Sequence, residues 1–390
     1  MWRPTFTILR KVVIPSLKDK TNLTRILYST KSRLPRSTAK LTLVSASVGV
    51  LLGVGYGGYT HYKINAKKSS ASVEDLAYPF LKERPQYKPH YRIVNDSDTS
   101  NLQLVLFQYR TCPFCCKVRA YLDSHGISYD IVEVDAVLRQ GIKWSTYKKV
   151  PIILAKVDGG YQQLMESTAI MSILETHLRD KSSQLQEVIK FYPQTKFISD
   201  DGKETTDIAN KYFIMHNTAV PDEKERAEEA DERKWRQWAD RVLVHTLSPN
   251  VYRTFGEALE TFKWFEQVGG WRQSFPEWEC ALMVYVGSVA MWIISKRLKA
   301  RHHIKDDVRQ SLYDAANQWT RAIKIKGTRF HGGDHPNLAD VSVYGVLSSI
   351  EGCEAFQDLR AHTDIGTWYD DIKNTISNKM GKVIAAHANA

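Results

Sequence analysis

The sequence predicts an α/β domain followed by an all-helical domain, with a membrane anchor ahead of both. Strand-like apolar runs and helical patterns alternate between residues 100 and 180, and several amphipathic helical patterns follow over residues 218–390. Residues 41–62 contain no Lys, Arg, Asp or Glu, and a helix of that length can span a bilayer. The expected segments are a basic leader (1–40), a transmembrane helix (41–62), a polar linker (63–99), the α/β domain (100–180), an irregular connection (181–217) and the helical domain (218–390).

The elements of the α/β domain follow a recognisable order. The expected order is a strand over Leu102–Phe107, a helix ending near Gly126, a strand over Ile127–Asp135, a polar helical stretch over Val137–Tyr147, strands over Ile152–Lys156 and Tyr161–Leu164, and a helix that begins at Glu166-Ser167. This order is typical of a thioredoxin-like, or glutaredoxin-like, layer.

A Cys-x-x-Cys motif, Cys112-Pro113-Phe114-Cys115, stands at the turn between the first strand and the first helix. The positive end of the helix dipole lowers the pKa of a thiol placed there, so a thiolate is available near neutral pH. Pro113 suits the first helical turn, where its missing N–H would be unpaired in any case. We therefore expect Cys112 to be the nucleophile and Cys115 the resolving thiol.

Two further pairs stand at positions that bind glutathione in proteins of this fold. A Val-Pro step with a cis-proline precedes the third strand of such proteins, and its backbone pairs with the cysteinyl unit of the tripeptide. An acidic-Ser pair starts the last helix, where the helix N-terminus receives the γ-glutamyl carboxylate. Here these positions read Val150-Pro151 and Glu166-Ser167, so we predict a glutathione site.

The positive charge of the chain is confined to its first part. The net charge is +11, but residues 1–70 hold 13 of the 54 Lys and Arg and only one of the 43 acidic residues, so the remainder is close to neutral. This distribution argues against a nucleic-acid partner. The basic, acid-poor leader is typical of a mitochondrial transit peptide, ahead of a single-pass membrane anchor.

The helical region contains three informative patterns. Trp235, Trp238 and Val242 fall at core spacing on one helix. Ala281–Ser295 is apolar and precedes a basic cluster, so it is either a buried helix or a membrane-facing helix with a basic collar. Asn337-Leu338-Ala339-Asp340 reads as a capped helix start.

Longer strings carry a specific resemblance. They are Leu106–Cys115 with Lys117–Arg119, Tyr147–Ile152, Lys234–Asp240, Leu247–Thr254, Ile294–Lys299 and Pro336–Asp340. Together they resemble the membrane-associated prostaglandin E synthase type 2 family over roughly residues 100–375, and the helical part resembles the C-terminal domain of glutathione transferases.

The resemblance implies an isomerase that converts the lipid endoperoxide prostaglandin H2 to prostaglandin E2. Cys112 would supply or host the reactive thiol, with Tyr109 hydrogen-bonding its sulfur. The supporting loop would be Pro113, Phe114 and Cys115, and glutathione would be held by Cys112, Val150, Pro151, Glu166 and Ser167. The resemblance also implies haem bound together with glutathione, a homodimer, and a Golgi anchor with proteolytic release to the cytoplasm as the alternative to mitochondria.

Two residues depart from the family pattern: Cys116 adds a third sulfur, and Glu166 stands where aspartate is commoner. Two other functions remain open, a glutaredoxin-type thiol–disulfide oxidoreductase and a non-catalytic membrane adaptor that binds glutathione or haem. The sequence predicts no metal site, because no second Cys-x-x-Cys or paired-histidine motif supplies further ligands.

Overall fold

The structure is a computed structural model that describes residues 78–180, 182–198, 204–215 and 222–385. The chain divides into two compact units, residues 1–72 and 73–390, and the described residues all belong to the second. Both hydrophobic clusters of that unit are formed by its own residues. The predicted leader and transmembrane helix lie outside the described residues.

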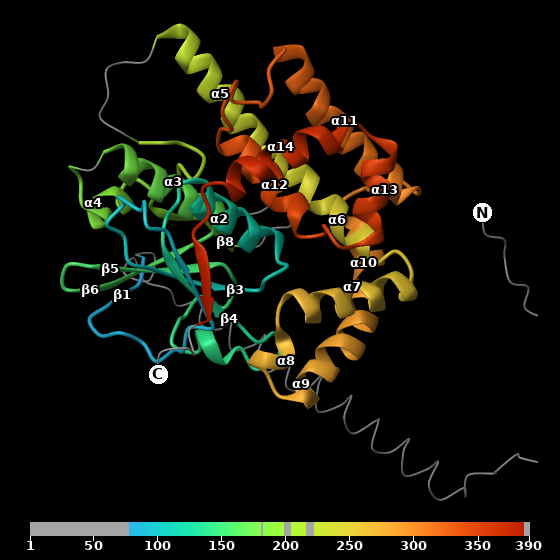
Figure 1. Cartoon of the computed structure of the whole chain (residues 1–390), viewed down its shortest axis with the longest axis horizontal. Coiled ribbons are helices and arrows are strands. Elements are labelled where there is room, and N and C mark those ends of the chain that lie inside the picture. Colours follow the sequence, from blue (N-terminus) through green and yellow to red (C-terminus); the bar gives the residue numbers. More distant parts are fainter. Residues whose placement is uncertain (1–77, 181, 199–203, 216–221, 386–390) are drawn as a thin grey trace, which may run out of the picture. The chain divides into compact units, whose positions relative to one another are not determined.

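A seven-stranded sheet forms the centre of the α/β domain, with the strand order β1-β6-β5-β3-β4-β2-β9 (Figure 1). β3 and β4 are parallel, and the other neighbouring pairs are antiparallel. The strands are β1 (Phe80–Leu81), β2 (Tyr91–Val94), β3 (Leu104–Gln108), β4 (Tyr129–Glu133), β5 (Ile152–Val157), β6 (Gly160–Met165) and β9 (Lys382–Ala385). The four strands predicted between residues 100 and 180 are all present.

The two faces of the sheet are covered differently. Alternate residues of a strand point to opposite faces. Leu104 and Leu106 of β3 therefore join the main core with helices α2 (Pro113–Ser124) and α3 (Ser167–Arg179). Val105 and Phe107 join a smaller cluster on the other face, which is covered by side chains of the loop after β4.

The prediction for that loop is wrong. Val137–Tyr147 contains only a short 3₁₀ turn, η2 (Gln140–Ile142), in place of the expected helix. The carboxylate of Asp135 accepts hydrogen bonds from the amides of Leu138, Arg139 and Gln140, the last at 2.7 Å. Arg139 also has a left-handed backbone, with φ of 51°. A side chain that captures successive amides in this way competes with helix formation.

Two predicted connecting segments also contain regular structure. In the expected linker 63–99, β1 and β2 belong to the sheet, and Ile93 of β2 is buried. The expected irregular connection 181–217 contains α4 (Leu185–Ile189) and a separate hairpin of β7 (Gln194–Ile198) and β8 (Glu204–Ile208). The linker prediction is therefore wrong from residue 80 onward, because apolar residues there pair with strand edges far along the chain.

The second part of the unit is helical except for its last strand. Its helices are α5 (Glu223–Trp238), η3 (Ala239–Leu243), α6 (Val244–Val251), α7 (Phe255–Val268), α8 (Trp271–Ser274), α9 (Glu277–Ala281), η4 (Leu282–Val286), α10 (Gly287–Arg301), α11 (Val308–Lys326), α12 (Leu338–Ser348), α13 (Glu354–His362) and α14 (Ile365–Ser377). The prediction of an all-α domain to residue 390 is wrong at its end, because β9 returns to the sheet and pairs with β2.

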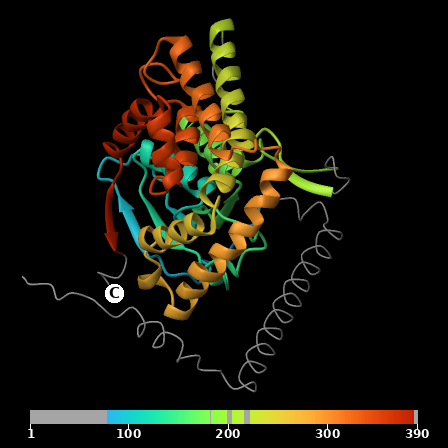
Figure 2. The same cartoon turned by 90° about the vertical axis from the view of Figure 1, so that its right-hand side faces the viewer.

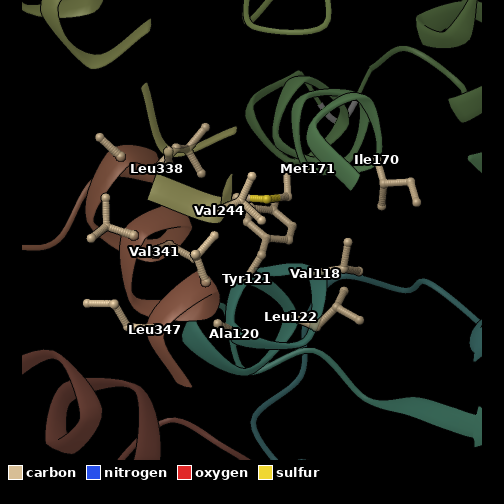
Figure 3. Close-up of a cluster of buried hydrophobic side chains, with 14 of the residues drawn as sticks. Val118, Ala120, Tyr121, Leu122, Ile170, Met171, Val244, Leu338, Val341 and Leu347 are labelled. Carbon is tan, nitrogen blue, oxygen red and sulfur yellow. The ribbon is translucent and has the colours of Figure 1, made fainter. Parts of the chain in front are cut away.

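The helical part packs directly against the α/β domain. Figure 3 shows side chains of α2, α3, α6 and α12 gathered in one core, with Tyr121 of α2 beside Met171 of α3 and Val244 of α6. One close approach is at Gly345 of α12, where an added Cβ would lie 2.5 Å from the Cα of Lys117 on α2. Only a residue without a side chain permits this contact.

The predicted start of α12 is confirmed. Asn337 accepts hydrogen bonds from the amides of Ala339 and Asp340, and Asp340 accepts one in return from the amide of Asn337 at 3.1 Å. The carboxylate of Asp340 also accepts a hydrogen bond from the indole N–H of Trp368 on α14 at 3.0 Å. This capping box therefore joins α12 to α14 as well as starting α12.

Two predictions for apolar helix faces are only partly correct. Trp235 is buried and Trp238 packs against the core, but Val242 is 43% exposed. Val242 lies in the π-helical turn η3, whose wider spacing moves it off the face that continues from α5. Ala281–Ser295 is not a buried helix either, because many of its large apolar side chains are exposed.

Candidate functional site

The reactive turn lies where β3 passes into α2. Cys112 is the N-cap of α2, and Pro113 occupies the first turn as predicted. The Cys112 amide donates to the carbonyl of Tyr109 at 3.0 Å, which closes the turn. Cys112 is half-buried and Cys115 is buried, so only the first of the two thiols is open to a substrate.

The two thiols differ strongly in acidity. Hydrogen bonding from the Cys115 thiol is the largest effect that lowers the pKa of Cys112, and it outweighs burial with help from the amides of Cys115 and Phe114. Burial raises the pKa of Cys115 well above its usual value, and its hydrogen bond to Cys112 adds to this. Within the pair, the thiolate is therefore favoured at Cys112 over Cys115.

Cys116 lies on another side of α2. Its sulfur donates to the carbonyl of Arg110 at 3.3 Å and accepts from the guanidinium of Arg119 at 3.3 Å. Burial raises its pKa, and Ser348 of α12 also bonds to it. Cys116 is thus a buried thiol held against α12, with hydrogen-bonding partners of its own.

Three tyrosines surround the reactive turn. Tyr109 is near enough to the two thiols for their charge to raise its pKa, although burial is the larger cause. Burial raises the pKa of Tyr147 and Tyr252 as well, again with a contribution from Cys112. Within the described residues no hydrogen bond joins Tyr109 to the Cys112 sulfur, so that part of the expectation is not borne out by the geometry.

Tyr147 and Tyr252 were not among the predicted site residues. Tyr147 belongs to the loop after β4, and Tyr252 follows α6 in the helical part. Both lie in strings that carry the family resemblance, which is the signal that could have identified them. All three phenols stay protonated at neutral pH and can donate a hydrogen bond to a ligand at Cys112.

The Val-Pro step predicted for tripeptide binding lies at the start of β5. The Val150-Pro151 peptide bond is cis, as predicted, and β5 begins directly after it. The amide and carbonyl of Val150 make no hydrogen bond to any described residue. They are therefore free to pair with an extended peptide.

The start of α3 holds the other pair predicted for tripeptide binding, Glu166-Ser167. Ser167 is buried, and its hydroxyl oxygen has no hydrogen-bond partner among the described residues. A buried unpartnered hydroxyl at a helix N-terminus suits an incoming carboxylate. Glu166 has φ of 69°, and its own carboxylate caps α3 by accepting from the Ala169 amide at 3.0 Å. In this structure Glu166 therefore orders the helix start next to Ser167.

A buried polar network lies beneath this helix start. The ammonium of Lys117 on α2 donates to the hydroxyl of Thr168 at 2.8 Å and forms an ion pair with Asp240 in η3. Thr168 and Tyr212 also donate to Asp240, at 2.6 and 3.1 Å. Burial alone would raise the pKa of Asp240, but Lys117 and these hydrogen bonds hold it below its ordinary value. The network fixes α2 and α3 to the helical part.

The network was not predicted, although one signal was present. Lys117 lies three and four residues before Ala120 and Tyr121, on the face of α2 that is otherwise apolar. A lysine on a core face needs a buried counter-charge.

Two cavities within the described residues lie away from the thiol. One, of about 410 Å³, lies between strand side chains such as Leu104, Asp130 and Tyr161. The other, of about 520 Å³, lies between α7 and the start of α13. Cys112 lines neither of them. Over the described ranges, no three His, Cys, Asp or Glu side chains converge as a metal site.

The α/β layer with its reactive turn and the helical part behind it define a thiol protein of the thioredoxin fold, with a helical domain appended. The glutaredoxin family matches residues 104–159. Among solved structures, glutathione transferase F7 from Populus trichocarpa is 12% identical, covering 71% of this chain and 98% of its own, with a TM-score of 0.37. The β-etherase LigF from Sphingobium sp. strain SYK-6 is 14% identical, with coverages of 71% and 98% and a TM-score of 0.39.

Two relatives are much more similar in sequence. Prostaglandin E synthase 2 of Mus musculus is 50% identical over 273 residues, 70% of this chain and 70% of the relative. Prostaglandin E synthase 2 of Danio rerio is 44% identical over 321 residues, 82% of this chain and 78% of the relative. The chain belongs to the prostaglandin E synthase 2 family.

Proposed function

We propose that this chain is a glutathione-dependent prostaglandin E synthase, which isomerises prostaglandin H2 to prostaglandin E2 at Cys112. The observation that carries the proposal is the division of acidity within the thiol pair. Cys112 is half-buried with a lowered pKa, while the buried Cys115 retains its proton. An accessible thiolate is the nucleophile that an endoperoxide bond requires.

The structure supports glutathione as the second component. The orphaned Ser167 hydroxyl and the first amides of α3 fit a carboxylate, and the free backbone of Val150 fits the cysteinyl unit. These residues would bind and orient the tripeptide next to Cys112. Glutathione would supply a second thiol at the site, while Cys112 would supply or host the reacting sulfur.

The chemistry balances without any external oxidant or reductant. A thiolate attacks the oxygen on C9, the O–O bond breaks, and the oxygen on C11 takes a proton to become a hydroxyl. A base then removes the proton on C9, and that electron pair forms the C9 ketone as the S–O bond breaks and the thiolate is regenerated. The protonated phenols of Tyr109 and Tyr147 would donate hydrogen bonds to the developing oxyanion.

The test uses residues 73–390, which form a compact unit with its own core. We expect this unit to convert prostaglandin H2 to prostaglandin E2 faster than glutathione alone does, and Cys112→Ser to abolish the difference. Cys280→Ser is the matched control, because Cys280 is a buried cysteine of the helical part. Undiminished conversion by Cys112→Ser would refute the thiol assignment.

A glutaredoxin-type thiol–disulfide oxidoreductase is the second candidate. The match of residues 104–159 to glutaredoxin favours it, as does a Cys115 that could resolve a mixed disulfide. It would reduce a glutathionylated peptide rapidly and isomerise prostaglandin H2 little, and Cys115→Ser would impair reduction through a dithiol step. Glutathione binding without either turnover would indicate a non-catalytic adaptor.

The remaining ligands and the location are proposed from the sequence resemblance and the leader. Haem bound with glutathione is one of them, and none of the contacts described for the thiol turn identifies an iron ligand. We also propose a homodimer, with a single-pass anchor at residues 41–62 in a mitochondrial membrane. A Golgi membrane with proteolytic release to the cytoplasm is the alternative. Imaging of the full chain with a C-terminal tag, with and without residues 1–40, tests the location.

A further inference from the structure

The continuous helical stretch α9–η4–α10 carries large apolar residues on its solvent-exposed side, where a surface helix usually carries polar ones. Among the described residues, Glu277–Arg301 is the one stretch with the length and composition to cross a membrane, and only a third of its most apolar window is buried. Its exposed large apolar residues are Trp278, Leu282, Tyr285, Val286, Val289, Ile293 and Ile294. We call these seven residues the α10 stripe.

The inner side of the same stretch attaches it to the domain: Met283 and Val284 are buried, and Met291 and Trp292 pack against the main core. Ser288 and Ser295 are buried, and Ser295 donates a hydrogen bond to the carbonyl of Tyr252 at 3.1 Å. At Gly287 an added Cβ would lie 2.7 Å from the ring of Phe262 on α7, so the two helices are in close contact there. The stretch is thus attached to the domain along one side, and it cannot cross a bilayer without breaking this packing.

The stretch is therefore apolar on both its inner and its outer side, whereas a surface helix of a soluble domain carries polar residues on its outer side. Trp278 is 59% exposed, Tyr285 61% and Val286 58%. Figure 2 shows the stretch running obliquely along the near side of the molecule, where no other described element covers it. An apolar surface of this extent indicates a partner.

The charges that follow the α10 stripe along the chain indicate what kind of partner it has. No charged residue lies between Cys280 and Ser295, and four cations follow at Lys296, Arg297, Lys299 and Arg301. Lys299 pairs with Asp306 at 3.0 Å. Lys296, Arg297 and Arg301 form no ion pair with any described residue, and Lys296 instead lies over the ring of Trp292 at 4.1 Å. Three cations are therefore available to an external anion.

We propose that the α10 stripe and its three free cations dock the folded unit on the surface of a bilayer that contains anionic lipid. The stripe enters the boundary between headgroups and acyl chains, with Trp278 and Tyr285 at headgroup depth, where aromatic rings with a polar atom are favoured. The cations contact lipid phosphates and carboxylates at the end of the stripe. This contact is independent of the uncharged run at residues 41–62 and does not depend on the proposed activity.

The experiment measures flotation of residues 73–390 with vesicles of phosphatidylcholine alone and of phosphatidylcholine mixed with phosphatidylserine. We expect binding to the mixed vesicles and much weaker binding to the neutral ones. The triple variant Tyr285→Ser, Val286→Ser and Val289→Ser should abolish binding. These side chains are exposed, so their replacement should leave the fold, checked by circular dichroism, intact.

Matched controls separate the stripe from general surface effects. Ile325→Ser removes the most exposed large apolar side chain of α11 and should leave binding unchanged. Arg297→Ala with Arg301→Ala should weaken binding to the mixed vesicles by roughly fivefold for each cation removed. Arg321→Ala with Lys324→Ala, two exposed cations of α11, should have little effect.

Two results would overturn the proposal. One is an absence of vesicle binding, together with self-association in sedimentation that the triple variant abolishes, because the stripe would then cover a second copy of this chain. The other is binding that the triple variant retains. Equal affinity for neutral and anionic vesicles would refute the role assigned to the cations.

Discussion

The buried pair of Lys117 and Asp240 allows a sharp test of how the site is held together. The change is Asp240→Asn, which keeps the shape of the side chain and removes its charge. The Lys117 ammonium is completely buried, and its other described partner is the neutral hydroxyl of Thr168. In the variant the buried Lys117 ammonium therefore faces a neutral amide at position 240 in place of a carboxylate.

The expected size of the effect follows from this burial. Removing one partner of a buried ion pair costs about 3–5 kcal/mol, because the remaining charge keeps its desolvation penalty. Replacing both partners restores most of the loss, so Lys117→Met combined with Asp240→Asn should be far more stable than Asp240→Asn alone. Asp370→Asn is the control: its pair with Arg360, at 2.7 Å, is much more exposed and should contribute at most about 1 kcal/mol.

The assay is urea unfolding of residues 73–390, followed by far-ultraviolet circular dichroism. Because the pKa of Asp240 is lowered, its stabilising effect is complete above the ordinary value of 3.8 and is lost as the pH falls through the lowered value. The difference between wild type and Asp240→Asn should therefore shrink in acid. The reasoning is refuted if Asp240→Asn costs no more than Asp370→Asn, or if the double variant is as unstable as the single one.

Three further outcomes are expected. Cys115→Ala should raise the midpoint of the pH profile for alkylation of Cys112 by about one unit, because it removes the main hydrogen bond to the thiolate; mass spectrometry of the labelled peptide measures this. Ser167→Ala should weaken glutathione binding about tenfold in calorimetry while leaving the unfolding midpoint unchanged, because its hydroxyl has no partner within the described residues. Glu175, buried but hydrogen-bonded by His125, has a pKa of about 2, lowered from 4.5. Its contribution to stability should be present above pH 4.5 and disappear toward pH 2, and Glu175→Gln should flatten the acid limb of the unfolding curve.

Features of the site that depend on adjacent residues were predicted from the sequence, whereas features that depend on long-range contacts were not. The Cys112 turn, the cis Val150-Pro151 bond and the start of α3 at Ser167 were all expected, because each depends on a few adjacent residues with strong backbone preferences. The cap of α12 was predicted for the same reason.

The failures have physical causes that adjacent residues do not reveal. The helix expected over Val137–Tyr147 is prevented by one carboxylate, Asp135, that captures three amides. Tyr252 comes within electrostatic range of Cys112 only because α6 packs against the α/β domain. The residues of the α10 stripe are exposed, although apolar residues usually lie in the core. Periodicity alone cannot distinguish an exposed apolar face from a buried one.

The pairing of β9 with β2 has a consequence for biosynthesis. Residues 382–385 complete an edge whose partner strand, residues 91–94, leaves the ribosome almost three hundred residues earlier. During translation the outer edge of β2 therefore has no partner strand while the helical part is being made. Nascent chains can pair with each other through this unpaired edge. A ribosome stalled between α14 and β9 would present the α/β and helical parts with a sheet that still lacks β9.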